Sequence, residues 1–113
     1  SSGERQRVML ARALIAPSSY LLLDEPLTNL DLQTSFMMLN VLRARAKSGT
    51  GIIISLHDIA LAAELTDDFV CLKQGRVVSQ GSLNQALTEG LAENVFGVKA
   101  NNAAGRWFIS GEL

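Results

Sequence analysis

Two adjacent carboxylates and a histidine follow the apolar runs YLLL and GIIIS in this sequence. Asp24 and Glu25 come directly after the first run, and His57 stands shortly after the second. One carboxylate can hold Mg²⁺, directly or through water, while the other polarises an attacking water molecule, as phosphate chemistry requires. Taken singly, the carboxylates equally fit the start of a polar loop, and a lone histidine such as His57 is more often structural than catalytic.

The first residues, SSGERQRVMLARAL, have the pattern of a helix that begins at an anion-binding end. Ser1 and Glu4 are spaced as in a capping box. Free N–H groups and the positive end of the helix dipole attract anions there, and Ser2 and Gly3 let phosphate approach the backbone closely. An ordinary capped surface helix has the same signature, so this segment alone leaves both interpretations open.

The sequence alternates between helical and strand patterns, and these predict the elements that position the polar residues named above. Helical spacing of Val8, Ala11, Leu14 and Ile15 predicts the core-facing side of the first helix. The alternation of strand and helix favours an α/β fold with a parallel sheet covered by helices, its strands buried on both faces. The predicted elements are helices over residues 1–16, 31–47 and 59–65, and strands over residues 20–24 and 51–55.

Both predicted strands should deliver their polar residues to one edge of the sheet. Ligands of open parallel sheets bind beyond the carboxyl ends of the strands, where Asp24, Glu25 and His57 are expected to lie. Pro26 predicts an extended backbone at Glu25, which would keep both carboxylates near that edge.

The second half of the sequence predicts smaller elements. The stretch DFVCLKQGRVVSQG predicts two strands around a turn at Gln74 and Gly75, with Cys71 as a small core residue. SLNQALTEGLAENVFG predicts short helices. VKANNAAGRWFIS predicts a terminal hairpin that turns at residues 102–105.

Composition limits the functions open to the chain. Its 113 residues are 48% hydrophobic and 19% charged, as in one ordinary globular domain. Ten basic and eleven acidic side chains give a net charge of -1, which supplies no bulk attraction to nucleic acid or to an anionic membrane. A single cysteine excludes an internal disulfide, and no apolar run is long enough to span a membrane. We therefore expect a soluble domain without a nucleic-acid partner.

Taken together, these motifs resemble the ATP-binding subunits of ABC transporters. SSGERQRVMLARAL is similar to the signature motif and its helix, and YLLLDEP is similar to Walker B with its catalytic glutamate. LTNLD is similar to the D-loop, and SLHD is similar to the histidine switch. FVCLKQGRVVSQG resembles the paired strands that follow the switch, so the resemblance runs through the whole chain.

The resemblance implies a site for ATP and Mg²⁺. It implies that Asp24 serves Mg²⁺, that Glu25 acts on the hydrolytic water, and that His57 contacts the γ-phosphate. It further implies that the helix start binds the γ-phosphate of ATP held by the opposite subunit, and that Asp31 communicates across that dimer. The residues so implied at the helix start are Ser1, Ser2, Gly3 and Glu4.

The sequence departs from the family pattern in two respects. Ser2 stands where the signature motif usually has its first glycine, which narrows the allowed backbone angles. Residues 1–113 contain no P-loop of the form Gly-x-x-x-x-Gly-Lys-Ser/Thr and no glutamine loop. We therefore expect the C-terminal part of a P-loop NTPase domain of the ABC class, with a short antiparallel C-terminal addition, that is inactive as an isolated ATPase.

The tail ALTEGLAENVFGV resembles that of ATPases serving importers of iron-siderophore complexes, haem and cobalamin. The resemblance then implies a second nucleotide-binding domain, a transmembrane permease and a substrate-binding protein as partners, and a peripheral position on the cytoplasmic face of the cell membrane. Two alternatives stay open. One is a DNA-maintenance ATPase, which shares the signature and Walker B motifs, and the other is a non-enzymatic half-domain that pairs with another ATPase subunit.

Overall fold

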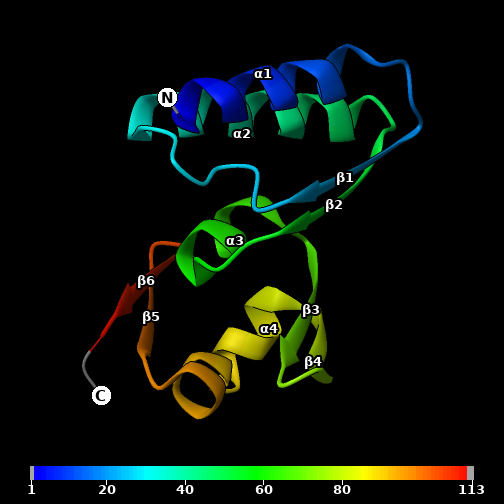
Figure 1. Cartoon of the computed structure of the whole chain (residues 1–113). Coiled ribbons are helices and arrows are strands. Elements are labelled where there is room, and N and C mark those ends of the chain that lie inside the picture. Colours follow the sequence, from blue (N-terminus) through cyan, green and yellow to red (C-terminus); the bar gives the residue numbers. More distant parts are fainter. Residues whose placement is uncertain (1, 112–113) are drawn as a thin grey trace. The chain divides into compact units, whose positions relative to one another are not determined.

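The computed structural model describes residues 2–111 of the chain, which divides into two compact units, Ser1–His57 and Asp58–Leu113 (Figure 1). Each unit is an arrangement of helices with one or two small sheets. The predicted elements are present in both units, and the capping of the first helix by Ser1 lies outside the described residues.

The first unit contains one parallel strand pair and two helices. Helix α1 (Ser2–Ile15) leads to strand β1 (Tyr20–Asp24), and helix α2 (Leu32–Lys47) connects β1 to strand β2 (Gly51–Ser55). The two strands pair in parallel, in continuous register from Tyr20 opposite Gly51 to Asp24 opposite Ser55. Both helices lie on the same side of the strand pair (Figure 1). This arrangement confirms the predicted parallel sheet.

Helix α2 has well-defined ends that its sequence explains. The carboxylate of Asp31 accepts the N–H of Thr34 at 2.7 Å, which is the expected N-cap interaction. At the other end, Ser48 donates its N–H to Ala44, and Gly49 has a φ of 103°, a conformation that glycine adopts without strain. The helix therefore begins and ends where the sequence predicts.

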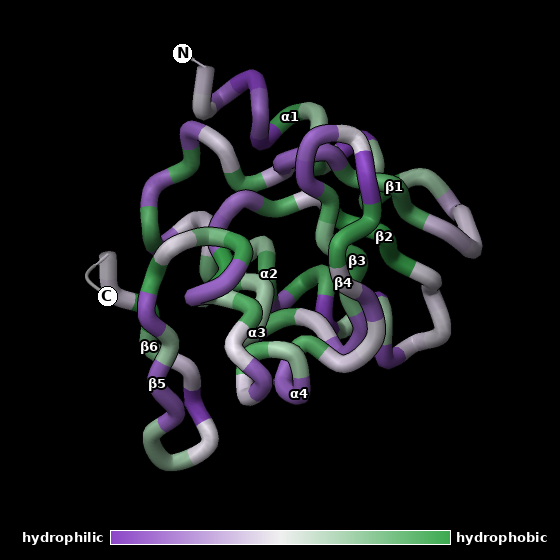
Figure 2. Tube along the Cα trace, turned by 90° about the horizontal axis from the view of Figure 1, so that it is seen from below, coloured by the Kyte–Doolittle hydropathy of each residue, from purple (hydrophilic) through white to green (hydrophobic). Residues whose placement is uncertain are grey.

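The strands of the first unit are buried on one face only, so the prediction of two buried faces is wrong. Leu21 is 5% exposed, whereas its neighbour Leu22 is 75% exposed and the cross-strand partner of Leu22, Ile53, is 70% exposed. Both strands consist of hydrophobic residues except at their ends (Figure 2). A continuous apolar run thus conceals the alternation of faces that every strand has.

The buried side of α1 agrees with the prediction at Leu14 and differs from it at the other three predicted residues. Val8, Ala11 and Ile15 are exposed, and the buried apolar residue of this helix is Leu10. The inward stripe keeps the helical period of three and four residues, but it includes a polar side chain, that of Gln6. Its members are Gly3, Gln6, Leu10, Ala13 and Leu14.

The second unit begins with helix α3 (Ile59–Leu65), followed by the antiparallel hairpin of β3 (Asp68–Lys73) and β4 (Arg76–Ser82). Next come helix α4 (Leu83–Thr88), a π-helical turn η1 (Ala92–Phe96) and the hairpin of β5 (Lys99–Ala103) and β6 (Arg106–Ser110). The first hairpin turns at Gln74 and Gly75, both with positive φ, as two-residue hairpin turns require. These elements confirm the sequence predictions for this half.

The core of the second unit forms where α4 meets the start of η1. Its buried residues are Leu83, Leu87, Leu91 and Ala92. Half-buried side chains of α3 and both hairpins pack against this core, among them Trp107, whose indole N–H donates to Asn84 at 2.9 Å. Cys71 is buried in β3, as predicted. Within residues 2–111, no helix combines the length and apolar character needed to cross a membrane.

Candidate active site

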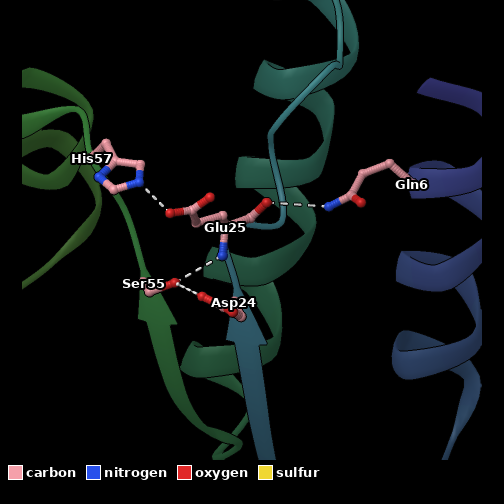
Figure 3. A network of polar contacts seen from close by, with 5 residues as sticks. All are labelled: Gln6, Asp24, Glu25, Ser55 and His57. Atoms are coloured by element: carbon pink, nitrogen blue, oxygen red, sulfur yellow. Dashed lines mark hydrogen bonds and ion pairs between the residues drawn. The ribbon is translucent and has the colours of Figure 1, made fainter. Parts of the chain in front are cut away.

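The carboxyl ends of β1 and β2 bring Asp24 and Ser55 together as cross-strand partners. The Ser55 hydroxyl donates to the Asp24 carboxylate at 2.5 Å and accepts the backbone N–H of Glu25 at 2.8 Å (Figure 3). One hydroxyl therefore orients the side chain of one acidic residue and the backbone of the next. This arrangement exists because parallel strands end at the same edge of a sheet.

The backbone at Glu25 turns sharply, so the predicted extended conformation is wrong. Its φ is 45°, a left-handed value that costs a residue with a side chain of the order of 1–3 kcal/mol. Hydrogen bonds on both sides hold it there: the Glu25 N–H donates to Ser55, and the Glu25 carbonyl accepts the N–H of Thr28 at 3.3 Å. Pro26 occupies the second position of the resulting turn, which its fixed φ suits.

The Glu25 side chain reaches the histidine that follows β2. Its Oε1 contacts Nε2 of His57, so the two residues form a polar pair beyond the strand ends (Figure 3). The Glu25 side chain is 40% exposed and the His57 side chain is 88% exposed. A ligand in solution can therefore reach both. The structure thus gathers Asp24, Glu25 and His57 at one edge, and their chemical roles stay predictions.

Gln6 is a member of this site that the sequence analysis missed. Its side-chain amide Nε2 donates to the carbonyl of Glu25 at 3.2 Å (Figure 3), and also to the carbonyl of Pro26 at 2.8 Å. Hydrophobic periodicity ignores glutamine, and for that reason the inward side of α1 was misplaced. The signal that could have identified Gln6 is its place four residues before Leu10, which puts both on the same side of the helix.

The other predicted residues lie at helix starts. Ser2, Gly3 and Glu4 form the first turn of α1, one turn before Gln6, and Ser1 lies outside the described residues. Asp31 caps α2. Its hydrogen bonds with Thr34, helped by the nearby Arg7 guanidinium, hold the pKa of its carboxyl below the ordinary value.

The donor set at the strand ends fits Mg²⁺ that arrives with a phosphate ligand. Asp24 is an exposed carboxylate whose Oδ1 accepts the Ser55 hydroxyl, which leaves further lone pairs for a cation or its water. Magnesium is commonly held by one or two carboxylates together with substrate phosphates. No group of three or more histidine, cysteine and acidic side chains that could enclose a metal is found in residues 2–111.

Comparison with known proteins places the chain in a family. A family model described as ABC transporter matches residues 1–28. The hemin import ATP-binding protein HmuV of Rhodococcus jostii is 44% identical over 86% of this chain, and the match covers 33% of that protein. The chain thus spans about a third of the length of this curated relative.

Solved structures agree with the sequence comparison. An ATP-binding subunit of an ABC transporter matches 84% of this chain and 40% of its own, with a TM-score of 0.73 and 29% identity. A dimeric ATP-binding cassette in a post-hydrolysis state with ADP and phosphate matches 74% of this chain and 36% of its own, with a TM-score of 0.67 and 31% identity. The chain belongs to the ABC transporter ATPase family, and its fold is that of the ATPase domain of this family.

Proposed function

We propose that these residues are the catalytic part of an ATPase subunit that powers an ABC importer, and that they include the signature motif of its nucleotide-binding domain. The observation that carries the proposal is the contact between Glu25 and His57 beside Asp24 at the ends of a parallel strand pair. A carboxylate, a histidine and a cation ligand at one strand edge are the groups that phosphoryl transfer to water needs.

Each residue of the cluster has a chemical role in this proposal. Glu25 accepts the proton of the attacking water, and its carboxylate is held in place by His57. His57 also contacts the γ-phosphate when ATP is bound. Asp24 holds Mg²⁺, which offsets the charge on the phosphate oxygens. These groups act mainly by positioning and by electrostatic stabilisation, which supply most of the catalysis in such reactions.

The start of α1 has a role across a dimer in the same proposal. Ser1, Ser2, Gly3 and Glu4 bind the γ-phosphate of ATP held by a second nucleotide-binding domain, and Asp31 contacts that domain. The free N–H groups of a helix start suit an anion, and Ser2 is exposed. The dimeric cassette among the similar structures supports this arrangement.

The partners and substrate follow from the relatives. Because the matched curated proteins are named hemin import ATP-binding proteins, we propose a haem or metal-chelate importer, with a transmembrane permease and a substrate-binding protein as partners. The subunit would lie on the cytoplasmic face of the membrane. The same names do not favour the DNA-maintenance alternative.

Replacement of Glu25 by glutamine tests the proposal in the full-length gene product. We expect E25Q to lower kcat for ATP hydrolysis by at least about 100-fold, because a general base typically contributes that much or more. ATP binding should persist, since the amide keeps the size and shape of the side chain. The matched control is E89Q, on an exposed glutamate at the end of α4, and it should hydrolyse ATP at the wild-type rate. Retained turnover in E25Q would contradict the role of Glu25.

A further inference from the structure

The turn that presents Glu25 is held from three directions. Ser55 binds its N–H from β2, and Thr28 closes the turn from the following loop. The third contact comes from α1, where the amide of Gln6 donates to the carbonyl of Glu25 (Figure 3) and also to that of Pro26, and so bridges the two. Gln6 thus joins the first helix to the turn.

This bridge stabilises a backbone conformation at Glu25 that is unfavourable by itself. Glu25 has a positive φ and precedes a proline, two conditions that are unfavourable together for a residue with a side chain. The bridge also fixes two successive carbonyls with a single planar amide. Without Gln6, the Pro26 carbonyl would lose this donor and the Glu25 carbonyl would keep only the Thr28 N–H, so the peptide between Glu25 and Pro26 and the carboxylate it carries would be held less firmly.

We infer that Gln6 is a positioning residue for Glu25, and that through it helix α1 determines the conformation of the turn that presents the carboxylate. The kinetic part of this inference rests on the proposed function. In that function the first turn of α1 binds the γ-phosphate of the ATP that the opposite subunit holds. Gln6 lies one turn further along the same helix. Closure of the dimer on the start of α1 is then communicated to Glu25 through the side chain of Gln6.

Replacement of Gln6 by methionine removes the bridge and keeps the helix. Methionine is unbranched, similar in length and a good helix former, so α1 should persist. In the full-length gene product we expect Q6M to lower kcat about tenfold, the effect of losing one or two partly buried hydrogen bonds. The KM for ATP should stay within about twofold, because Gln6 acts on Glu25 and not on the nucleotide.

A rescue variant and a control separate this role from general stability. Q6K restores N–H donors without an acceptor and should recover most of the lost kcat. Q33M places the same substitution on an exposed glutamine of α2 and should leave turnover unchanged. Wild-type kcat in Q6M, an equal loss in Q6K, or a loss that appears in KM alone would overturn the inference.

Hydrogen exchange gives a second readout that does not need ATP hydrolysis. The amide of Thr28 donates to the carbonyl that Gln6 also binds, so Q6M should accelerate its exchange several-fold, while amides of the β3–β4 hairpin should not change. If the wild-type protein does not hydrolyse ATP, the proposed function fails and exchange alone decides the inference. Faster exchange at Thr28 would then support it, and unchanged exchange would overturn it.

Discussion

Loss of the Ser55 hydroxyl should weaken the response of ATP turnover to Mg²⁺ more than it weakens ATP binding. In S55A the Asp24 carboxylate loses a donor at 2.5 Å, and the Glu25 N–H loses an acceptor at 2.8 Å. Groups that orient a metal-binding carboxylate typically contribute about 10- to 100-fold to metal affinity or activity. Ser55 and Asp24 are both exposed, so water replaces part of the lost contact. We therefore expect the lower limit, about tenfold or 1.4 kcal/mol.

The assay is steady-state ATP hydrolysis by the full-length gene product at saturating ATP and varied Mg²⁺. The Mg²⁺ concentration for half-maximal turnover should rise about tenfold in S55A. S55T is the matched control, because threonine keeps the hydroxyl and suits a strand. A wild-type Mg²⁺ dependence in S55A would refute the reasoning, as would an equal shift in S55T, since the hydroxyl would then not be the group that matters.

Two further predictions concern stability. Arg45 donates to the carbonyl of Leu14 in the last turn of α1 at 2.6 Å. We therefore expect R45M to lower the free energy of unfolding by about 2 kcal/mol in urea titrations. K47M, on the exposed end of α2, is the control and should change it little. The hydrogen bonds from Thr34 lower the pKa of Asp31 in the folded protein. The carboxylate therefore stabilises the fold fully at a pH above its pKa in the unfolded chain, about 3.9. It loses that contribution as the pH falls through its pKa in the folded protein. Between pH 5 and pH 3 the melting temperature of the wild type should therefore fall further than that of D31N, and parallel curves would show that Asp31 does not contribute.

The sequence was sufficient to predict the elements because their ends have local signals. Asp31 and Asp58 each precede a helix and accept its free N–H groups, so the start of each helix is specified within a few residues. The positions of Asp24 and His57 were predictable for a different reason. Both follow apolar runs that pair in parallel, and parallel strands end at one edge.

The features that were missed depend on contacts between distant residues. The positive φ of Glu25 opposes the local preference of a residue before proline, and it is maintained by Ser55 and Gln6 from other elements. Exposure of Leu22 and Ile53 could not be predicted either, because Leu22 is as hydrophobic as its buried neighbour Leu21, and Ile53 is identical to the half-buried isoleucines beside it. Local pattern thus predicts which elements form, and tertiary contacts decide how the site is shaped.

The polar contacts around Glu25 also determine when the site can appear during folding. The hydrogen bonds of Gln6 and Ser55 join residues 19, 20, 30 and 31 positions apart, whereas the turn bond from Thr28 and the helix caps at Asp31, Asp58 and Ser82 join residues three apart. Local contacts form early and distant ones must wait for closure of long loops. A nascent chain can therefore form its helices before Asp24 and Glu25 are held in their places beside Ser55. The edge that carries Asp24, Glu25 and His57 is assembled only when β2 pairs with β1, so we expect the proposed site to form late in folding.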